Sequence, residues 1–336
     1  MTARARLTPH MQGYQAKFTD AGEVRWLPYL MYFHPAGHRS EVVNTDGSGF
    51  RYSVAHGRRY SAADRAGIES VRVLAGSSTV FGIGASTDAW TLPSRLTEHD
   101  PRGEPWLNFG GRSFNSTQEM LLLTMYRHLL PKVEEIVLFS GFNNLGLARL
   151  PESVRGEHGA FFNCNAFFDA FGPDGDPGRR RRSVRQRLGR AAASGAEPVP
   201  SLDAQLGYAS ELTLRHLAIW QALAVDLGAR LTFVLQPLAG WVRPVGSPEE
   251  EELFAELDEL GRFSEVYGDI LTTAVNTDYA AAIEAGAKQL GVDFVNLSPV
   301  LADRLAPDQW LFVDRIHFTD AGHDFVARLL LDLLDR

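Results

Sequence analysis

The sequence predicts a three-layer α/β/α fold in which a five-stranded parallel sheet lies between two layers of helices. Five short apolar runs, which begin near residue 70, alternate with helical patterns, and this alternation is typical of a parallel sheet. Each run is followed by glycine or polar residues, which would meet at the carboxyl edge of the sheet, where ligand sites lie. The predicted strands are residues 71–75, 106–109, 136–139, 231–235 and 292–297.

Helical patterns occupy the intervals between these strands. Ser116 and Glu119 have the spacing of a capping box in front of the apolar segment 120–130. The last helix would begin near Thr319 and carry a leucine-rich face. The acidic run Glu249–Glu252 is expected to form a solvated helix start. The remaining predicted helices are residues 205–227, 249–260 and 271–290.

The first 69 residues show little periodicity, but they contain bulky aromatic side chains that would need to be buried. We therefore expect residues 1–69 to form an ordered extension that packs on a main domain of residues 70–336. Its aromatic residues would either pack on the edge of the sheet or line a ligand pocket. The residues concerned are Trp26, Tyr29, Tyr32 and Phe33.

A second interruption lies after the third strand. Residues 147–205 include the glycine- and proline-rich stretch 172–178 and then seven arginines between Arg179 and Arg190. We expect a long insertion here that is mobile in part. The arginines would either form a solvated loop or bind a carboxylate, a phosphate or a carrier-protein surface.

Composition narrows the class of protein. The chain has 336 residues and a formal net charge of −8, which argues against nucleic acid as the main partner. Cys164 is the single cysteine, so no intrachain disulfide is possible. The amino terminus lacks the apolar core of a signal peptide, and no stretch approaches the ~20 apolar residues of a membrane span, so we expect a cytoplasmic protein. Histidine and glycine spacings predict neither a metal nor a cofactor, and the oligomeric state stays open.

Two segments supply the parts of a serine nucleophile and its base. Ser78 follows the first strand at a glycine-flanked bend, and Asp314 and His317 lie three residues apart after the last strand. An imidazole can take the serine proton while a carboxylate orients the ring. Each segment alone has a plainer interpretation, namely a serine in a polar loop and polar residues at a helix entrance.

Two further strand ends carry donors for a developing negative charge. Asn143 follows the third strand, and its side-chain amide could donate to an oxyanion. The segment from Asn108 to Ser113, after the second strand, could offer a backbone N–H to the same oxygen. An asparagine in a turn is the plainer alternative.

Taken in order, these segments resemble the four sequence blocks of the SGNH (GDSL-type) hydrolases. The matching residues are Gly-Ser-Ser78-Thr, Asn108-x-Gly-x-x-Ser113, Gly141-x-Asn143-Asn144 and Asp314-x-x-His317, and the resemblance spans about residues 70–335. The resemblance implies a flavodoxin-like sheet. It also implies a Ser78 nucleophile, a His317 base and an Asp314 orienter, with an oxyanion hole formed by Ser78, Ser113 and Asn143.

Three positions depart from the pattern of that family. Ser77 stands in place of an aspartate, Ser113 in place of the glycine of the oxyanion hole, and Asn144 in place of an aspartate. A side chain at Ser113 would be strained if the loop needs a positive φ.

We predict a serine hydrolase that cleaves an ester, or an amide, of a small acyl group on a sugar or natural-product substrate. The first alternative is an acyltransferase with the same three residues, in which the insertion excludes water. The second is a non-catalytic relative that binds a glycan or a protein.

Overall fold

The computed structural model describes residues 2–15, 17–18, 25–64, 67–152, 155, 198–261 and 263–335. The predictions for Cys164, for the stretch 172–178 and for Arg179–Arg190 concern residues outside these ranges. Among the described residues, no helix is both long and apolar enough to cross a membrane.

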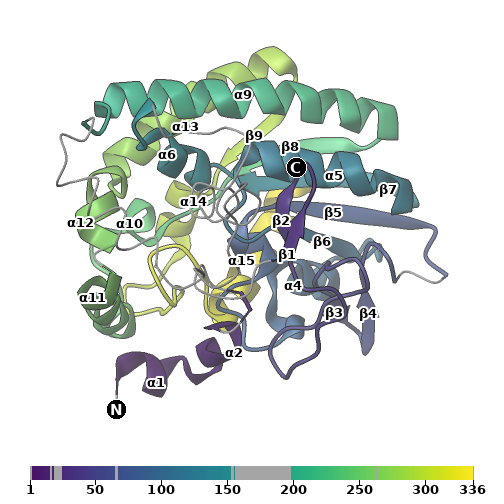
Figure 1. The fold of residues 1–336 in the computed structure, drawn as a ribbon, viewed down its shortest axis with the longest axis horizontal. Helices are drawn as coiled ribbons and strands as arrows, with labels where there is room; N and C mark the ends of the chain where they lie inside the picture. The colour runs from purple at the N-terminus through teal and green to yellow at the C-terminus, as the bar shows by residue number, and fades with distance from the viewer. Residues whose placement is uncertain are drawn as a thin grey trace, which may run out of the picture.

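The structure confirms the predicted fold class, since five parallel strands form one sheet between two layers of helices (Figure 1). The strands are β5 (Ser70–Gly76), β6 (Trp106–Gly110), β7 (Lys132–Ser140), β8 (Arg230–Leu235) and β9 (Asp293–Asn296). Their spatial order is β6-β5-β7-β8-β9. Numbered along the chain this is 2-1-3-4-5, the flavodoxin-like order, in which ligands bind where the strand order reverses, here beside β5.

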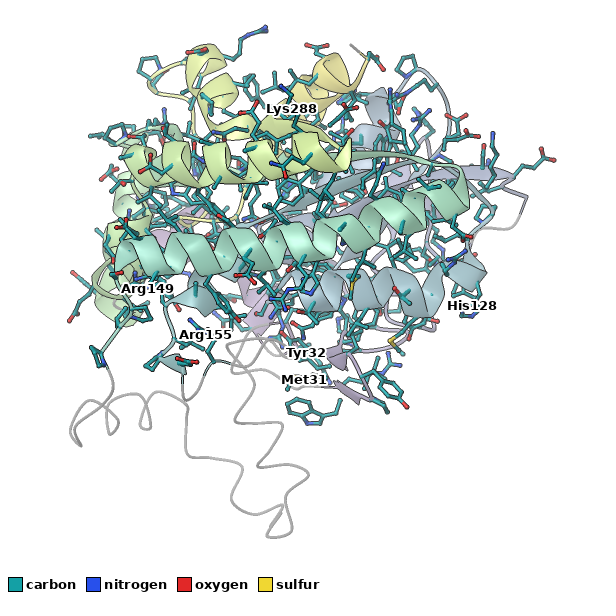
Figure 2. All side chains as sticks on the ribbon, turned by 90° about the horizontal axis from the view of Figure 1, so that it is seen from above. Met31, Tyr32, His128, Arg149, Arg155 and Lys288 are labelled. Atoms are coloured by element: carbon teal, nitrogen blue, oxygen red, sulfur yellow. The ribbon has the colours of Figure 1, made fainter. Side chains whose placement is uncertain are left out.

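Alternate residues of each strand face opposite helical layers, because side chains in a strand point to alternate faces. Val73 and Ala75 of β5 pack into one apolar cluster, and Leu74 between them packs into another. The first cluster is closed by α5 (Ser116–Tyr126), α9 (Leu202–Leu227) and α13 (Thr273–Leu290). The second is closed by α4 (Leu92–His99), α14 (Leu297–Arg304) and α15 (Asp320–Leu334). Figure 2 shows α9 and α13 side by side on the first face.

The remaining helices and strands complete the described fold. They are α1 (Ala3–Leu7), η1 (Pro9–Met11), α2 (Gln12–Gln15), β1 (Arg25–Leu27), β2 (Met31–Phe33), β3 (Ser53–Ala55), β4 (Arg58–Tyr60), α3 (Ser78–Phe81), η2 (Asp88–Trp90), η3 (Arg127–Leu129), α6 (Phe142–Ala148), α10 (Ala239–Val242), α11 (Pro248–Gly261), α12 (Phe263–Tyr267) and η6 (Gly268–Ile270). The strand pairs β1–β2 and β3–β4 are antiparallel.

Among the helices that were not predicted from the sequence, α4 and α14 help to close the second cluster. Both α4 and α14 are eight residues long and carry a proline in the first turn, Pro93 and Pro299 respectively. A proline there costs no helical hydrogen bond, because the first N–H groups of a helix have no partner inside it. Proline usually ends a helix, but in the first turn of α4 and of α14 it is compatible with the helix.

The start of α5 also differs from the prediction. Asn115, not Ser116, caps the helix, and its capping-box partner is Gln118. Glu119 is consequently free to turn inward, where it is 1% exposed.

The aromatic residues of the N-terminal segment divide between packing and exposure. Tyr32 and Phe33, on the purple hairpin in Figure 1, are buried in the cluster that also contains Phe114. Trp26 packs partly buried against that cluster, whereas Tyr29 is 85% exposed. Tyr32 and Phe33 thus belong to the core.

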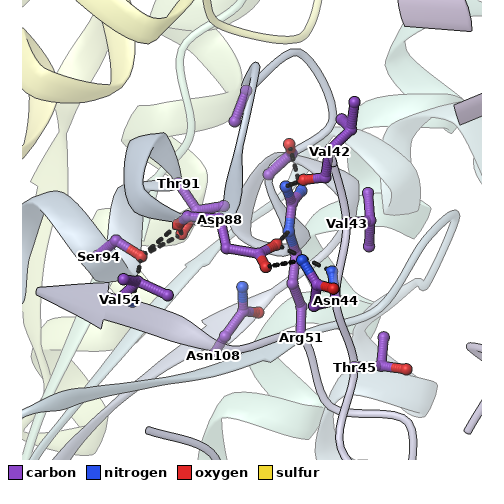
Figure 3. Close-up of polar contacts among 12 residues, drawn as sticks. Val42, Val43, Asn44, Thr45, Arg51, Val54, Asp88, Thr91, Ser94 and Asn108 are labelled. Carbon is purple, nitrogen blue, oxygen red and sulfur yellow. Dashed lines mark hydrogen bonds and ion pairs between the residues drawn. The ribbon is translucent and has the colours of Figure 1, made fainter. Parts of the chain in front are cut away.

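A buried ion pair fixes the N-terminal segment to η2, which follows α3 (Figure 3). The Nε of Arg51 lies 2.7 Å from Oδ1 of Asp88, and neither side chain is more than 7% exposed. The amide nitrogen and the Nδ2 of Asn44 also donate to this carboxylate, at 3.1 and 2.7 Å. The guanidinium further donates to the carbonyl oxygens of Phe81 and Gly82, at 3.2 and 2.8 Å. These two carbonyls close helix α3, so Arg51 holds the helix that begins with Ser78.

Replacing Arg51 by methionine should destabilise the protein by about 3–5 kcal/mol, because it leaves the Asp88 carboxylate buried without its cation. Urea unfolding followed by circular dichroism measures the change. Lys132→Gln is the control, since it breaks an ion pair to Glu134 in which the lysine is 66% exposed, and it should cost about 1 kcal/mol or less. Equal losses in the two variants would contradict the role given to Arg51.

Candidate active site

Ser78 lies at the carboxyl edge of the sheet, where the backbones of α3 and β6 pack closely against each other. It is the first residue of α3, directly after β5, and its side chain is partly exposed. The end of β6 lies against this helix at Gly110, where a Cβ atom would come within 2.1 Å of the Phe81 nitrogen. Only glycine permits this approach, and it keeps α3 next to the segment that carries Ser113.

The structure brings Ser78, His317 and Asp314 together, although 239 positions separate the serine from the histidine. The Nε2 of His317 lies 2.7 Å from the Ser78 Oγ, and its Nδ1 lies 2.7 Å from Oδ2 of Asp314. A carboxylate can only accept, so Nδ1 carries the proton and Nε2 is left to accept from the serine hydroxyl. This is the arrangement of a nucleophile, its base and the group that orients the base.

Asp314 has an environment that keeps it ionised. Its Oδ1 accepts from the amides of Ile316 and His317, at 2.8 and 2.7 Å. Burial raises the pKa of the Asp314 carboxyl, but the attraction of His317 in its protonated form, the hydrogen bonds of His317 and the amide of Ile316 outweigh burial, so the net shift is downward. A carboxylate that stays charged can stabilise an imidazolium in contact with it.

A buried glutamate holds the loop that leads to Asp314. Oε1 of Glu250 accepts from the amides of Leu311 and Phe312, at 2.8 and 2.9 Å, and Oε2 accepts from Arg243 at 2.8 Å. Glu250 is fully buried, so the expectation of a solvated start is wrong for this residue. The reason is that the carboxylate finds an arginine and three backbone amides inside the protein, the third being that of Ser247.

The proposed oxyanion donors lie on two adjoining turns. Ser113 follows β6 with a φ of 58° and is 6% exposed. Asn143 lies in the first turn of α6, and its Nδ2 donates to the carbonyl oxygen of Phe114 at 2.7 Å. An amide group carries two N–H donors, so this bond uses one of them. The donor roles of Ser78, Ser113 and Asn143 stay predictions.

The other two departures from the family pattern have structural partners. The Nδ2 of Asn144 donates to the hydroxyls of Ser116 and Thr213, each at 2.8 Å, and its Oδ1 accepts from the Ser116 amide. An aspartate could not donate to those hydroxyls. Ser77 donates to the Oε1 of Gln236 at 3.3 Å, next to β8.

A buried carboxyl contacts Ser140, the last residue of β7, three positions before Asn143. Glu119 is buried, and the Ser140 hydroxyl lies 2.9 and 2.7 Å from its two oxygens. Among the described residues, no arginine or lysine forms an ion pair with it. Burial therefore raises the pKa of Glu119 to about 8, against a small opposing contribution from Ser140.

This raised pKa predicts a pH-dependent stability that Glu119→Gln removes. Because the folded protein holds the proton up to about pH 8 while the unfolded chain releases it near pH 4.5, the stabilisation is complete below the lower value and is lost as pH rises to the upper one. Relative to the glutamine variant, the wild type should lose up to ~1.4 kcal/mol per pH unit across that window. Urea unfolding at pH 5, 6, 7 and 8 measures it, and parallel stability curves would contradict the assignment.

Sequence reasoning missed the burial of three ionisable residues near the site, namely Arg51, Glu119 and Glu250. In sequence they look like any solvated charge, since burial depends on partners far along the chain. One local signal existed. Ser247 and Glu250 have capping-box spacing, and the structure has both reciprocal bonds.

No protein-family model matches this sequence, and a search of curated proteins finds no match. Solved structures do match over most of the chain. An acetyl xylan esterase has 11% identity and a TM-score of 0.42, and the alignment covers 78% of this chain and 98% of the esterase. A GDSL-like lipase from Bacteroides thetaiotaomicron has 14% identity and a TM-score of 0.42, with coverage of 80% and 88%. An acetyl-xylooligosaccharide esterase from a Geobacillus species has 13% identity and a TM-score of 0.41, with coverage of 79% and 93%. At these TM-scores the likenesses carry no weight for function, which rests on the geometry.

Proposed function

We propose that this protein is a serine esterase of the SGNH hydrolase kind that acts through a covalent acyl-enzyme. The observation that carries the proposal is the unbroken pair of hydrogen bonds from Ser78 through His317 to Asp314, each 2.7 Å between heavy atoms. Two further points support it. The Asp314 pKa is lowered, and Ser78 is partly exposed.

In the proposed reaction, the Ser78 Oγ attacks the ester carbonyl carbon while its proton passes to the Nε2 of His317. Asp314 accepts the hydrogen bond from Nδ1 and stabilises the imidazolium. As the tetrahedral intermediate collapses, the bond to the leaving alcohol breaks and His317 returns the proton to it. A water molecule then repeats the sequence on the acyl-enzyme, releasing the acid and restoring the Ser78 hydroxyl.

Three donors are proposed for the negative oxygen of the intermediate. They are the backbone N–H groups of Ser78 and Ser113 and the side-chain amide of Asn143. The Ser78 amide opens α3, so it has no acceptor within that helix. Asn143 is held by its bond to Phe114, which keeps the second amide hydrogen in a fixed direction. Fixed donors aimed at a developing charge are worth more than mobile ones.

The substrate class stays as proposed from the sequence, an ester of a small acyl group on a sugar or natural product. The acyltransferase alternative depends on the insertion within residues 147–205, and most of it lies outside the described residues. The geometry of Ser78, His317 and Asp314 serves both reactions, since they differ only in whether water or an alcohol takes the acyl group.

A fluorophosphonate probe should label the wild-type protein at Ser78. Labelling should vanish in Ser78→Ala, and hydrolysis of a p-nitrophenyl ester should fall by several orders of magnitude in Ser78→Ala and in His317→Ala. Ser86→Ala is the matched control, because that serine bonds to Asp320 rather than to His317. An unlabelled wild type would favour the non-catalytic alternative.

Asn143→Ala should lower kcat by about 10²–10³-fold while leaving the protein folded, because it removes one proposed donor to the oxyanion. Steady-state kinetics on the same ester measure the change. Circular dichroism checks folding, since the variant also loses the bond to Phe114. A kcat within about twofold of wild type would remove Asn143 from the oxyanion hole.

A further inference from the structure

The turn that carries Ser113 has an unfavourable backbone conformation. Its φ of 58° lies in the left-handed region, which costs a residue other than glycine or asparagine about 1–2 kcal/mol. Such strain persists only where surrounding contacts hold it. The contacts on both sides of Ser113 therefore determine where its N–H points.

On the far side of Ser113, the holding contacts come from within the main domain. Phe114 donates its amide to Gly111 at 3.2 Å and accepts from the Asn143 side chain at 2.7 Å. These bonds fix one neighbour of Ser113 to the residue after β6 and to α6.

On the near side, the holding contacts come from the N-terminal segment. The Tyr32 hydroxyl donates to the carbonyl oxygen of Arg112 at 2.7 Å, and the Nε2 of His34 accepts from the amide of Arg112 at 3.1 Å. Both polar backbone atoms of the residue before Ser113 are thus bound by a segment about 80 positions earlier. We call these two hydrogen bonds the Arg112 clamp.

His34 is built to accept rather than to donate at Nε2. Its Nδ1 lies 3.2 Å from the carbonyl oxygen of Gly49, so Nδ1 carries the proton. Its ring lies over Phe81, the last residue of α3, with 3.9 Å between centroids. Burial and the charge of Arg112 lower the pKa of His34 well below its usual value, which keeps the ring neutral. One imidazole therefore connects the Ser113 turn with the helix of Ser78.

We propose that Tyr32 and His34 are positioning residues of the active site, which hold the Ser113 N–H toward the oxyanion through the Arg112 clamp. This inference rests on the proposed esterase function. It assigns to the N-terminal segment a part in catalysis rather than in packing alone. It also accounts for the serine at this turn. Glycine would adopt the positive φ without strain, whereas serine needs contacts that hold it there, and the clamp supplies them.

Tyr32→Phe tests the clamp, since it removes the hydroxyl and keeps the ring in the core. Its kcat for an oxoester should fall about ten- to a hundredfold with KM within about twofold, because a displaced donor weakens only the transition state. Tyr52→Phe is the matched control in the same segment. Its hydroxyl is bonded to Asp64 at 3.2 Å rather than to Arg112, and its kcat should stay at the wild-type value.

A thionoester substrate distinguishes the loss of a positioned oxyanion donor from general structural damage to the active site. Its sulfur is a weak hydrogen-bond acceptor, so a lost oxyanion donor should slow the thionoester much less than the oxoester. The ratio of the two rates should fall in Tyr32→Phe and stay constant in Tyr52→Phe. A loss that is equal for both substrates would mean structural damage and would overturn the inference.

Two further variants use the geometry directly. His34→Gln can keep an acceptor near the Nε2 position, whereas His34→Asn is too short to reach Arg112, so the glutamine variant should retain more activity. Adding Ser113→Gly to Tyr32→Phe should restore most of the lost kcat, because glycine holds the positive φ without a clamp.

The inference and the proposed function fail in different ways. A wild type that reacts with the fluorophosphonate at Ser78, combined with equal kcat and equal rate ratios in Tyr32→Phe and Tyr52→Phe, would overturn the clamp alone. A wild type that does not react at Ser78 would refute the esterase function, and the catalytic role of the clamp with it.

Discussion

The hydrogen bond between Ser78 and His317 is the contact on which the proposed chemistry depends. It joins segments 239 positions apart, so each must be fixed independently before the two side chains meet. On one side, Gly110 lets β6 approach α3 and Arg51 closes the end of that helix. On the other, Glu250 binds the amides that lead to Asp314. A short bond between distant residues is thus the product of buried polar contacts placed well away from it.

Local periodicity is why the parallel sheet and its longest helices could be predicted. Each strand contains a short stretch of apolar residues, and the carboxyl ends of parallel strands share one edge, so Ser78, Asn143 and His317 could be placed at that edge from their positions after strands. The catalytic roles of these residues remain predictions. Helices α4 and α14 were not predicted, because a proline in the first turn of a helix cannot be distinguished in sequence from a proline that ends one.

The N-terminal segment could not be predicted in the same way. Its contacts with the site are single hydrogen bonds between distant residues, such as that of Tyr32 with Arg112. No residue pattern within the segment predicts such contacts. Arg51 and His34 look solvent-exposed in sequence, yet both are buried because their hydrogen bonds are satisfied by backbone carbonyls and amides of other segments. Burial of a charge depends on partners, which a single sequence does not display.

Two carboxyls near this site, the part-exposed Asp314 and the buried Glu119, have opposite pKa shifts, and the difference suits the proposed reaction. Asp314 is next to an imidazole and backbone amides, which lower its pKa, whereas burial raises the pKa of Glu119, whose hydrogen bonds within the described residues come from the Ser140 hydroxyl. Ser140 lies three residues before Asn143, on the side where negative charge would develop. A carboxylate there would oppose the oxyanion by Coulomb repulsion. A protonated Glu119 avoids that repulsion, so the single carboxylate of the pair is the one in contact with the base.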